Sequence, residues 1–418
     1  MLRRCMCKIT HLILLLACCG CFWQGTLLAQ SRPTPTSGPV DRGRVSSAID
    51  AAAEYLVRAC GDDGRFAYRV ALDPNALLPS DYNLLRHAGA IYALAQYVDR
   101  QPHDDARQVL MRAGTYLKGT IQPVAGNRHM TAVWTVAETT GIDAPRQAKL
   151  GGAGLGLVAL LSIEKIEPGF TSLDELRRLG RFLLYMQKPD GSFYSKYYPD
   201  RGRDDRWTSM YYPGEAALAL LMLYEADPKR QWLGGASKAL AALARSGSQR
   251  PKTLPDQWVL LATARITPYF ETDALLVSRR ELLDHARRTC RDMLEDQQGQ
   301  LASPSIRGCY THDGRTCPTA TRLEGLLAAL QFLPREEQSF RQQIRHSIDD
   351  GIRFLLDNQV KEGPYAGGLT RVALGFSGSE REDAAVDSHP TEIRIDFVQH
   401  ALSAMLAYER ELRSVDER

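Results

Sequence analysis

The sequence has little excess charge, few aromatic residues and no series of long apolar runs. Its 418 residues are 44% hydrophobic, 24% charged and only 8% aromatic, which excludes disordered, collagen-like and polytopic membrane proteins. The formal net charge is +3, and Arg3, Arg4 and Lys8 supply all of it because no acidic residue precedes Ala29. The rest of the chain is neutral, so we expect no basic surface and no nucleic-acid partner.

The first residues have the layout of an export signal. Residues 1–8 are basic, and residues 9–17 are apolar but too few to span a bilayer. Two cleavage sites compete. The sequence LLAC resembles a bacterial lipobox and would place a lipid on Cys18, whereas LLA ending at Ala29 resembles an ordinary signal-peptidase site.

We therefore expect residues 1–29 to be a signal peptide and residues 30–45, rich in Pro, Ser and Gly, to be a flexible linker. The mature protein would be periplasmic, a cell-envelope lipoprotein or extracellular. Its only contact with a membrane would be the lipid on Cys18.

Four cysteines follow the signal, namely Cys60, Cys290, Cys309 and Cys317. An oxidising compartment permits disulfides, and the short separation makes Cys309 and Cys317 the natural pair. A zinc site with His312 is the alternative, but this set has three ligands and no CxxC pair. We expect at most a disulfide that closes this loop, and we expect neither a metal nor a cofactor.

A repeat of about sixty residues runs through the chain. Each copy has an aromatic-led apolar segment, a polar turn with Gly, and a second aromatic. The clear copies are YLVRACGDDGRF at 55–66, FLLYMQKPDGSF at 182–193 and FLLDNQVKEGPY at 354–365. Weaker copies start at Tyr116 and Met293, and a degenerate copy spans 237–244. The repeat therefore has six units.

In every unit a second segment follows that is rich in small and apolar residues, typical of a buried helix. These segments begin near Asn83, Lys149, Tyr212, Asp256, Thr321 and Glu392. The first segments carry charges on one side, as outer helices do. No alternating pattern indicates a strand. We predict an all-α fold, an α/α toroid of six helix pairs, formed by residues 46–418 as a single domain, with the glycines of the second segments allowing close helix packing.

This pattern resembles the six-hairpin superfamilies, which include glycosidases and uronic-acid epimerases and, more distantly, terpenoid cyclases and protein prenyltransferases. The resemblance covers about residues 46–411, and the turn in FLLYMQKPDGSF is similar to the turns of both groups. It implies that the inner helices run the same way, so that their first turns meet at one mouth of the ring.

Polar residues recur at this end of the inner segments, whereas their far ends are mostly Ala, Leu and Val. We predict that the mouth holds the site. The candidate catalytic residues are Asp396, Glu215, His400, Glu324 and Tyr212. The candidate substrate-binding residues are Tyr82, Arg86, His87, Lys149, Asp256, Trp258, Arg322, Glu392 and Arg394.

The strongest cluster is Glu392, Asp396 and His400, because residues four apart share one face of a helix. Its alternative is a surface ion-pair network, although FVQHALSAML is too apolar for an exposed helix. The alternative interpretation of His87 is a histidine packed in the core. The alternative interpretation of Tyr211 and Tyr212 is a belt of aromatic residues that serves packing. Asn83 and Asp256 have the alternative of helix caps.

Aromatic side chains beside carboxylates and arginines suit sugar rings that carry a negative charge. We therefore expect an enzyme acting on an anionic, uronic-acid-containing glycan. Hydrolysis needs two carboxylates across the bond, whereas lyase or epimerase chemistry needs a base and an acid around an α-proton. The segment YYPGEAALALLMLYE is similar to one in glucuronyl C5-epimerases, and both chemistries stay open.

The alternatives are a cyclase-like toroid and a non-catalytic glycan-binding scaffold. A squalene-type cyclase needs an Asp-x-Asp-Asp acid, and Asp204-Asp205 is the nearest approach to it. It also needs an aromatic cavity to stabilise carbocations, which the low aromatic content disfavours.

Overall fold

The computed structural model describes residues 39–124, 126–141, 144–271, 275–300, 304–376 and 389–416. The expected signal peptide, Cys18 and most of the expected linker lie outside these residues. From Val40 onward the chain forms one compact unit. Within the described ranges, every helix is either too short or too polar to cross a membrane.

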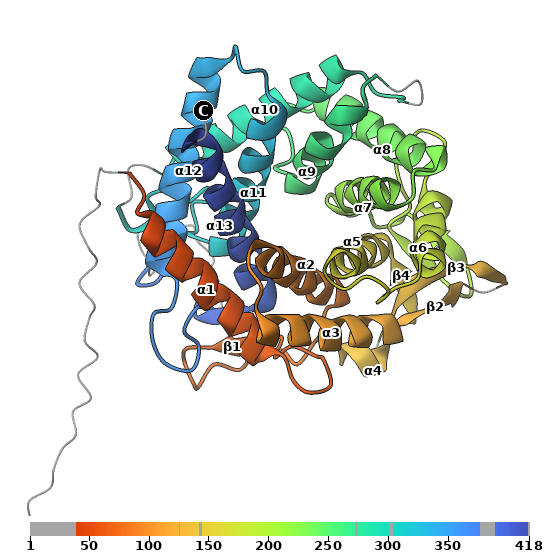
Figure 1. Cartoon of the computed structure of the whole chain (residues 1–418), viewed down its shortest axis with the longest axis horizontal. Helices are drawn as coiled ribbons and strands as arrows, with labels where there is room; N and C mark the ends of the chain where they lie inside the picture. Colours follow the sequence, from red (N-terminus) through yellow and green to blue (C-terminus); the bar gives the residue numbers. More distant parts are fainter. Residues whose placement is uncertain are drawn as a thin grey trace, which may run out of the picture. The chain divides into compact units, whose positions relative to one another are not determined.

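Six inner helices form a closed ring in which each helix packs against the next and the last returns to the first (Figure 1). They are α2 (Leu84–Arg100), α5 (Leu150–Ile166), α7 (Tyr212–Ala226), α9 (Gln257–Ile266), α11 (Thr316–Phe332) and α13 (Ile395–Asp416). In α5 and α7 buried residues occupy nearly every position, because these helices have neighbours on all sides. The predicted all-α toroid is confirmed.

An outer helix precedes each inner helix in the chain and packs outside the ring. These helices are α1 (Arg42–Ala59), α3 (Asp104–Gly119), α6 (Leu173–Met186), α8 (Arg230–Ser248), α10 (Arg279–Gln298) and α12 (Gln338–Asn358). Capping boxes begin α6 at Ser172 and α10 at Ser278, which satisfies backbone N–H groups that would otherwise lack partners. The six predicted pairs are all present.

Two glycines allow the inner helices to approach closely. A Cβ atom on Gly151 would lie 2.3 Å from Oε2 of Glu215 and 2.4 Å from Cδ1 of Tyr212. A Cβ atom on Gly214 would lie 2.9 Å from Oδ2 of Asp256. Glycine at these positions therefore brings α5, α7 and the start of α9 together, and three candidate site residues with them.

Short strands lie in the connections, and our expectation of none was wrong. One antiparallel sheet has the order β2 (Ile121–Val124), β3 (Asn127–Thr135), β4 (Gln147–Lys149), β5 (Lys196–Tyr198), β6 (Gly202–Asp204). A second pairs β1 (Arg69–Ala71) with β7 (Glu392–Arg394). The longest strand, β3, is exposed at its start and buried over its remaining residues, so it lacks the alternation that marks a half-buried strand.

The two ends of the ring differ. Connections from outer to inner helices carry all the strands and the helix α4 (Ala137–Thr140), whereas most connections back to the outer layer are short turns. The 3-10 helices η1 (Thr267–Tyr269) and η2 (Pro304–Ile306) complete the elements. We call the end where the inner helices begin the loop face and the opposite end the turn face.

Candidate active site

Asp396 lies in the first turn of α13, between two arginines. Arg394 donates from Nε to Oδ1 at 2.6 Å and from Nη2 to Oδ2 at 2.9 Å, and Nε of Arg86 lies 2.9 Å from Oδ2. Burial alone would raise the pKa of Asp396, but the two guanidinium groups outweigh it and lower the pKa. Asp396 is therefore ionised at neutral pH. This favours the ion-pair interpretation, and a catalytic role for Asp396 stays a prediction.

Glu392 does not join Asp396 on a helix face, because residues 392–394 form β7 and α13 begins at Ile395. Its fully buried carboxylate lies 3.1 Å from Nη1 of Arg69 and 3.0 Å from Nη1 of Arg371. Glu392 thus fastens β7 to β1 and to the preceding loop. The predicted stripe of three titratable groups is not formed.

Two buried carboxyl groups lie side by side on the inner ring, Glu215 on α7 and Asp256 at the N-cap of α9. Oδ1 of Asp256 accepts hydrogen bonds from the backbone N–H groups of Trp258 at 2.9 Å and Val259 at 3.4 Å, so the cap interpretation holds for this oxygen. Oδ2 of Asp256 and Oε2 of Glu215 have no hydrogen-bond partner in the described part of the chain. Such buried oxygens are rare in proteins and call for a partner such as a ligand hydroxyl.

Both carboxyl groups bind protons more strongly than usual. Burial raises the pKa of Asp256 to about 7. Burial, and then the charge of Asp256, raises the pKa of Glu215 well above its ordinary value. Glu215 therefore keeps its proton to higher pH than an ordinary glutamate, while Asp256 is divided between its two forms near neutral pH. One group that donates a proton beside one that exchanges it is an arrangement that acid-base catalysis requires.

His400 on α13 pairs with Glu324 on α11. Nδ1 of His400 lies 2.8 Å from Oε2 of Glu324, and the side-chain amide of Gln399 lies 3.0 Å from Nε2. Burial would lower the pKa of His400, but the Glu324 carboxylate overcomes this effect and raises it. A histidine oriented by a carboxylate suits proton transfer. Both residues were predicted from the sequence, but their contact joins residues 76 positions apart on two helices and left no local signal. The helix α11 begins five residues before the expected Thr321.

Tyr82 and His87 lie in the core between α2 and α3. The Tyr82 hydroxyl is 2.7 Å from Nδ1 of His87, and Nε2 of His87 is 2.9 Å from the Ala113 carbonyl. Burial lowers the pKa of His87 to about 4. The ring is completely buried and neutral, so the core interpretation fits His87.

A cationic rim, defined as Lys149, Lys196 and Arg86, borders the loop face. Lys149 is the N-cap residue of α5 and Lys196 lies on β5. Burial lowers the pKa of Lys149, and so do the charges of Lys196 and Arg86. Within the described residues neither lysine forms an ion pair. Two lysines that have no acidic partner and lie near Arg86, which is itself paired with Asp396, favour a bound anion.

Aromatic rings accompany this rim. The Trp207 ring lies 5.8 Å from the Tyr212 ring and 4.8 Å from Nζ of Lys196, while Trp207 and Tyr211 remain 49% and 38% exposed. Burial raises the pKa of Tyr212, and so does Glu215, so its hydroxyl stays protonated. Sequence analysis missed Lys196, because nothing in the sequence indicated the short strand that carries it.

Two other predicted residues differ in their surroundings. Trp258 is buried, with its ring 6.0 Å from that of His400. Arg322 is half-buried, donates to the Pro318 carbonyl at 3.0 Å, and lies within electrostatic range of Tyr211. Trp258 thus belongs to the interior of the site and Arg322 to its edge.

No family model and no curated protein matches the sequence. Solved structures match its fold. Cellobiose 2-epimerase from Spirochaeta thermophila has a TM-score of 0.61 at 13% identity, over 89% of this chain and 97% of that one. A polysaccharide lyase has a TM-score of 0.56 at 13% identity, over 89% and 98%. A GH76 α-mannanase from Bacteroides thetaiotaomicron has a TM-score of 0.56 at 11% identity, over 88% and 97%.

The chain has the α/α toroid fold of these solved structures. The names of these three structures, an epimerase, a lyase and a mannanase, differ in activity and all refer to carbohydrates. At 11–13% identity the likeness concerns the fold, and the function of this toroid has to be argued from its own residues.

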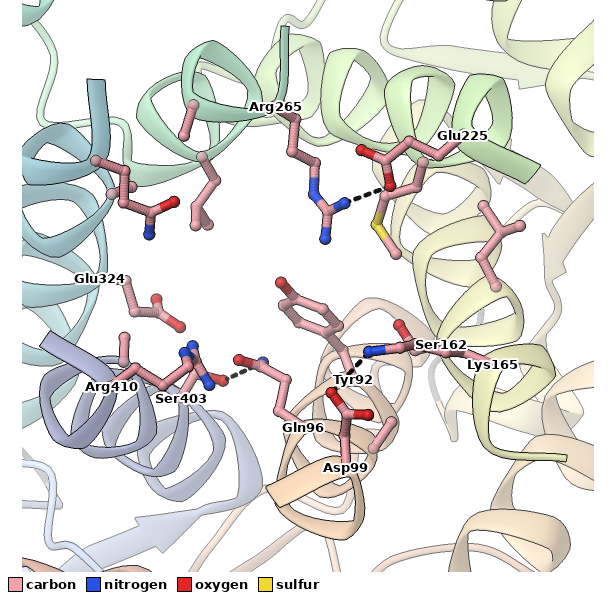
Figure 2. Close-up of a pocket in the computed structure, with 18 of the residues that line it drawn as sticks. Tyr92, Gln96, Asp99, Ser162, Lys165, Glu225, Arg265, Glu324, Ser403 and Arg410 are labelled. Carbon is pink, nitrogen blue, oxygen red and sulfur yellow. Dashed lines mark hydrogen bonds and ion pairs between the residues drawn. The ribbon is translucent and has the colours of Figure 1, made fainter. Parts of the chain in front are cut away.

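The turn face of the toroid is more polar than expected. A cavity of about 620 Å³ opens there on the ring axis, with residues from all six inner helices around it (Figure 2). Tyr92, Asp99, Lys165, Glu225 and Arg265 lie in its wall, so our description of the far helix ends as mostly apolar was wrong. Tyr92 is the one aromatic residue that lines this cavity in the described part of the chain, which does not suit carbocation chemistry.

The four cysteines within the described residues form no disulfide. Cys60, Cys290, Cys309 and Cys317 are all free thiols, and Sγ of Cys309 instead lies 3.2 Å from the Thr319 hydroxyl. Within the described ranges no three His, Cys, Asp or Glu side chains gather around a metal position, so Cys309, His312 and Cys317 are not assembled into the zinc site that we considered.

Proposed function

We propose that this chain is an exported carbohydrate-active enzyme that acts at its loop face on an anionic, uronic-acid-containing glycan. One observation carries the proposal, namely that the cationic rim, whose two lysines have no acidic partner in the described residues, accompanies buried groups able to exchange protons. The rim explains why the substrate is anionic. The buried groups, Glu215, Asp256 and the Glu324–His400 pair, explain why the protein is an enzyme.

Substrate binding follows from the rim. A uronate carboxylate accepts hydrogen bonds from Lys149 and Arg86 and forms ion pairs with them. The exposed Trp207 and Tyr211 rings offer faces for neighbouring sugars. Asp396 holds Arg86 and leaves it 32% exposed, so the guanidinium is oriented while still able to contact a ligand. This gives Asp396 a positioning role in the proposal.

Proton abstraction is the chemistry that the side chains favour first. His400, oriented by Glu324, removes the proton on the carbon next to the uronate carboxylate, and the rim cations stabilise the negative charge that develops there. In elimination the electron pair forms a C=C bond, the C–O bond breaks, and protonated Glu215 supplies the proton to the leaving oxygen. In epimerisation protonated Tyr212 or Glu215 returns a proton to the opposite face of the carbon.

Hydrolysis is the second candidate, because Glu215 and Asp256 form a carboxyl pair with separate proton affinities. Glu215 would protonate the glycosidic oxygen and Asp256 would activate water or attack the sugar. This route uses neither His400 nor the rim, so variants separate it from the first.

The purified protein would be incubated with a panel of acidic and neutral polysaccharides. Ultraviolet absorbance of unsaturated uronate identifies a lyase, reducing ends without that absorbance identify a hydrolase, and deuterium incorporation from D2O without cleavage identifies an epimerase. We expect turnover of an acidic polymer that His400→Gln lowers at least 100-fold and that the exposed His346→Gln leaves unchanged. Turnover of neutral polymers alone would overturn the anionic substrate, and equal activity of both variants would overturn the role of His400.

A further inference from the structure

The axial cavity on the turn face lies at the opposite end of the inner helices from the cationic rim, and Glu324 is the residue of its described lining that the reaction proposed above also uses. The cavity lies where the inner helices end, whereas Lys149, Asp256 and Asp396 lie where they begin. Its volume of about 620 Å³ falls within the range of roughly 300–1,000 Å³ that is typical of small-molecule sites. We propose that this cavity is a second binding site, which takes a small sugar acid.

The charged side chains in the cavity wall favour an acidic ligand. Most charged groups in the wall are already paired: Arg265 Nη1 lies 2.5 Å from Glu225, and Lys165 Nζ lies 2.7 Å from Asp99. Arg410 on α13 lines the same cavity, and within the described residues it forms neither an ion pair nor a hydrogen bond. It is therefore the cation that is left for a ligand.

Neighbouring acids do not satisfy Arg410. Asp99 and Glu409 lie within electrostatic range of it, but Asp99 is held by Lys165, and Glu409 lies 2.8 Å from both Arg100 and Arg413. A carboxylate matches the planar guanidinium with two parallel hydrogen bonds. Arg410 is exposed, so an anion in the cavity would replace solvent at a guanidinium that has no protein partner in the described residues.

Hydroxyl groups of the ligand also have partners. The Tyr92 hydroxyl points into the cavity, and the amide of Gln96 donates to the Ser403 hydroxyl at 3.0 Å on the wall beside Arg410 (Figure 2). Glu324 lines the same wall. Donors and acceptors grouped around one cation suit a polyhydroxylated carboxylate better than a simple inorganic anion.

Glu324 connects this site with the reaction centre, because the carboxyl group that lines the cavity also holds Nδ1 of His400 at 2.8 Å. A ligand in the cavity would therefore lie one side chain away from His400. Binding in the cavity does not depend on the proposed function, but this connection rests on it.

Glucuronate is the probe, with glucose as the uncharged comparison, and calorimetry on the purified protein measures the number of sites and their affinities. Arg410→Gln removes the cation of the cavity. Arg413→Gln is the matched control, since it lies one turn further along α13, is 60% exposed and pairs with Glu409. Lys149→Gln removes a cation of the rim at the other end of the ring.

We expect glucuronate to bind at two sites. At both sites we expect glucose to bind more weakly than glucuronate. Arg410→Gln should weaken one site at least tenfold, Lys149→Gln the other, and Arg413→Gln neither. Loss with Lys149→Gln alone would overturn the cavity site while leaving the proposed function standing. Loss with Arg410→Gln alone would support the cavity and contradict the rim. Crystals soaked in glucuronate should show it against Arg410, and unchanged melting temperatures exclude misfolding as the cause of any loss.

Discussion

Glu324 and His400 are 76 residues apart in the sequence, yet Oε2 of Glu324 lies 2.8 Å from Nδ1 of His400 inside the ring. The contact joins α11 to α13. It raises the pKa of His400, which burial alone would lower. It also lies between the two ends of the toroid, because Glu324 faces the axial cavity as well.

Replacing Glu324 by Gln should lower the pKa of His400. The carboxylate is what raises this pKa against the effect of burial, so without it burial dominates and the pKa should fall below the ordinary histidine value of 6.5. NMR titration of the histidine ring measures the change. The exposed Glu362→Gln is the control, and an unchanged His400 titration in Glu324→Gln would show that the pair does not set the proton affinity.

The same shift has a consequence for stability. A histidine whose pKa is raised on folding stabilises the protein below its unfolded pKa, and this contribution is lost as the pH rises through the folded pKa. Glu324→Gln should therefore cost more free energy of unfolding at pH 5 than at pH 9.

Asp256→Asn should raise the stability of the protein at alkaline pH. The folded pKa of about 7 exceeds the ordinary aspartate value of 3.8, so the folded state binds more protons and its stability falls as the pH rises from about 4 to about 7. Asparagine keeps the N-cap but removes the buried charge. We expect a gain of about 2–4 kcal/mol at pH 8 and almost none at pH 4.

Denaturant unfolding at both values of pH measures this difference. Asp205→Asn, at an exposed aspartate paired with Lys188, serves as the control and should change stability by less than about 1 kcal/mol. A loss of stability at pH 8 in Asp256→Asn would show that the carboxylate has partners which the structure does not contain.

Asp396→Asn should destabilise the fold. It leaves Arg86 and Arg394 facing each other without the carboxylate between them, and breaking a largely buried ion pair costs about 3 kcal/mol or more. Chemical unfolding measures the loss. If Asp396→Asn keeps its stability but loses its activity, the carboxylate acts in catalysis and the ion-pair interpretation is wrong.

Gly151→Ala should disturb the site through packing alone. The added methyl group would lie 2.3 Å from Oε2 of Glu215, and α5 and α7 have to separate to admit it, at about 1–3 kcal/mol. Gly152→Ala is the neighbouring control, because its Cβ would have no atom closer than 3.6 Å. Thermal unfolding should show a lower Tm for Gly151→Ala only, and equal values for the two variants would contradict the close contact.

Much of the fold follows from sequence because each unit repeats the same two signals, an amphipathic outer helix and an apolar inner helix. The candidate site is less predictable. Residues near the inner helix starts were found, including Glu215, Asp256 and His400, but Glu392 lies in a strand, His87 points into the core, and Lys196 gave no signal.

By itself, the sequence determined the ring, because six apolar helices with small residues can bury their surfaces only by packing together inside an outer layer. Tertiary structure decided which side chains meet. An inner helix is buried on every side, so its sequence has no polar stripe to show which residues face the axis. Three features depend on that orientation, namely the Glu324–His400 contact, the ion pairs of Asp396 with Arg86 and Arg394, and the charged cavity on the turn face. Only the closed ring establishes the orientation.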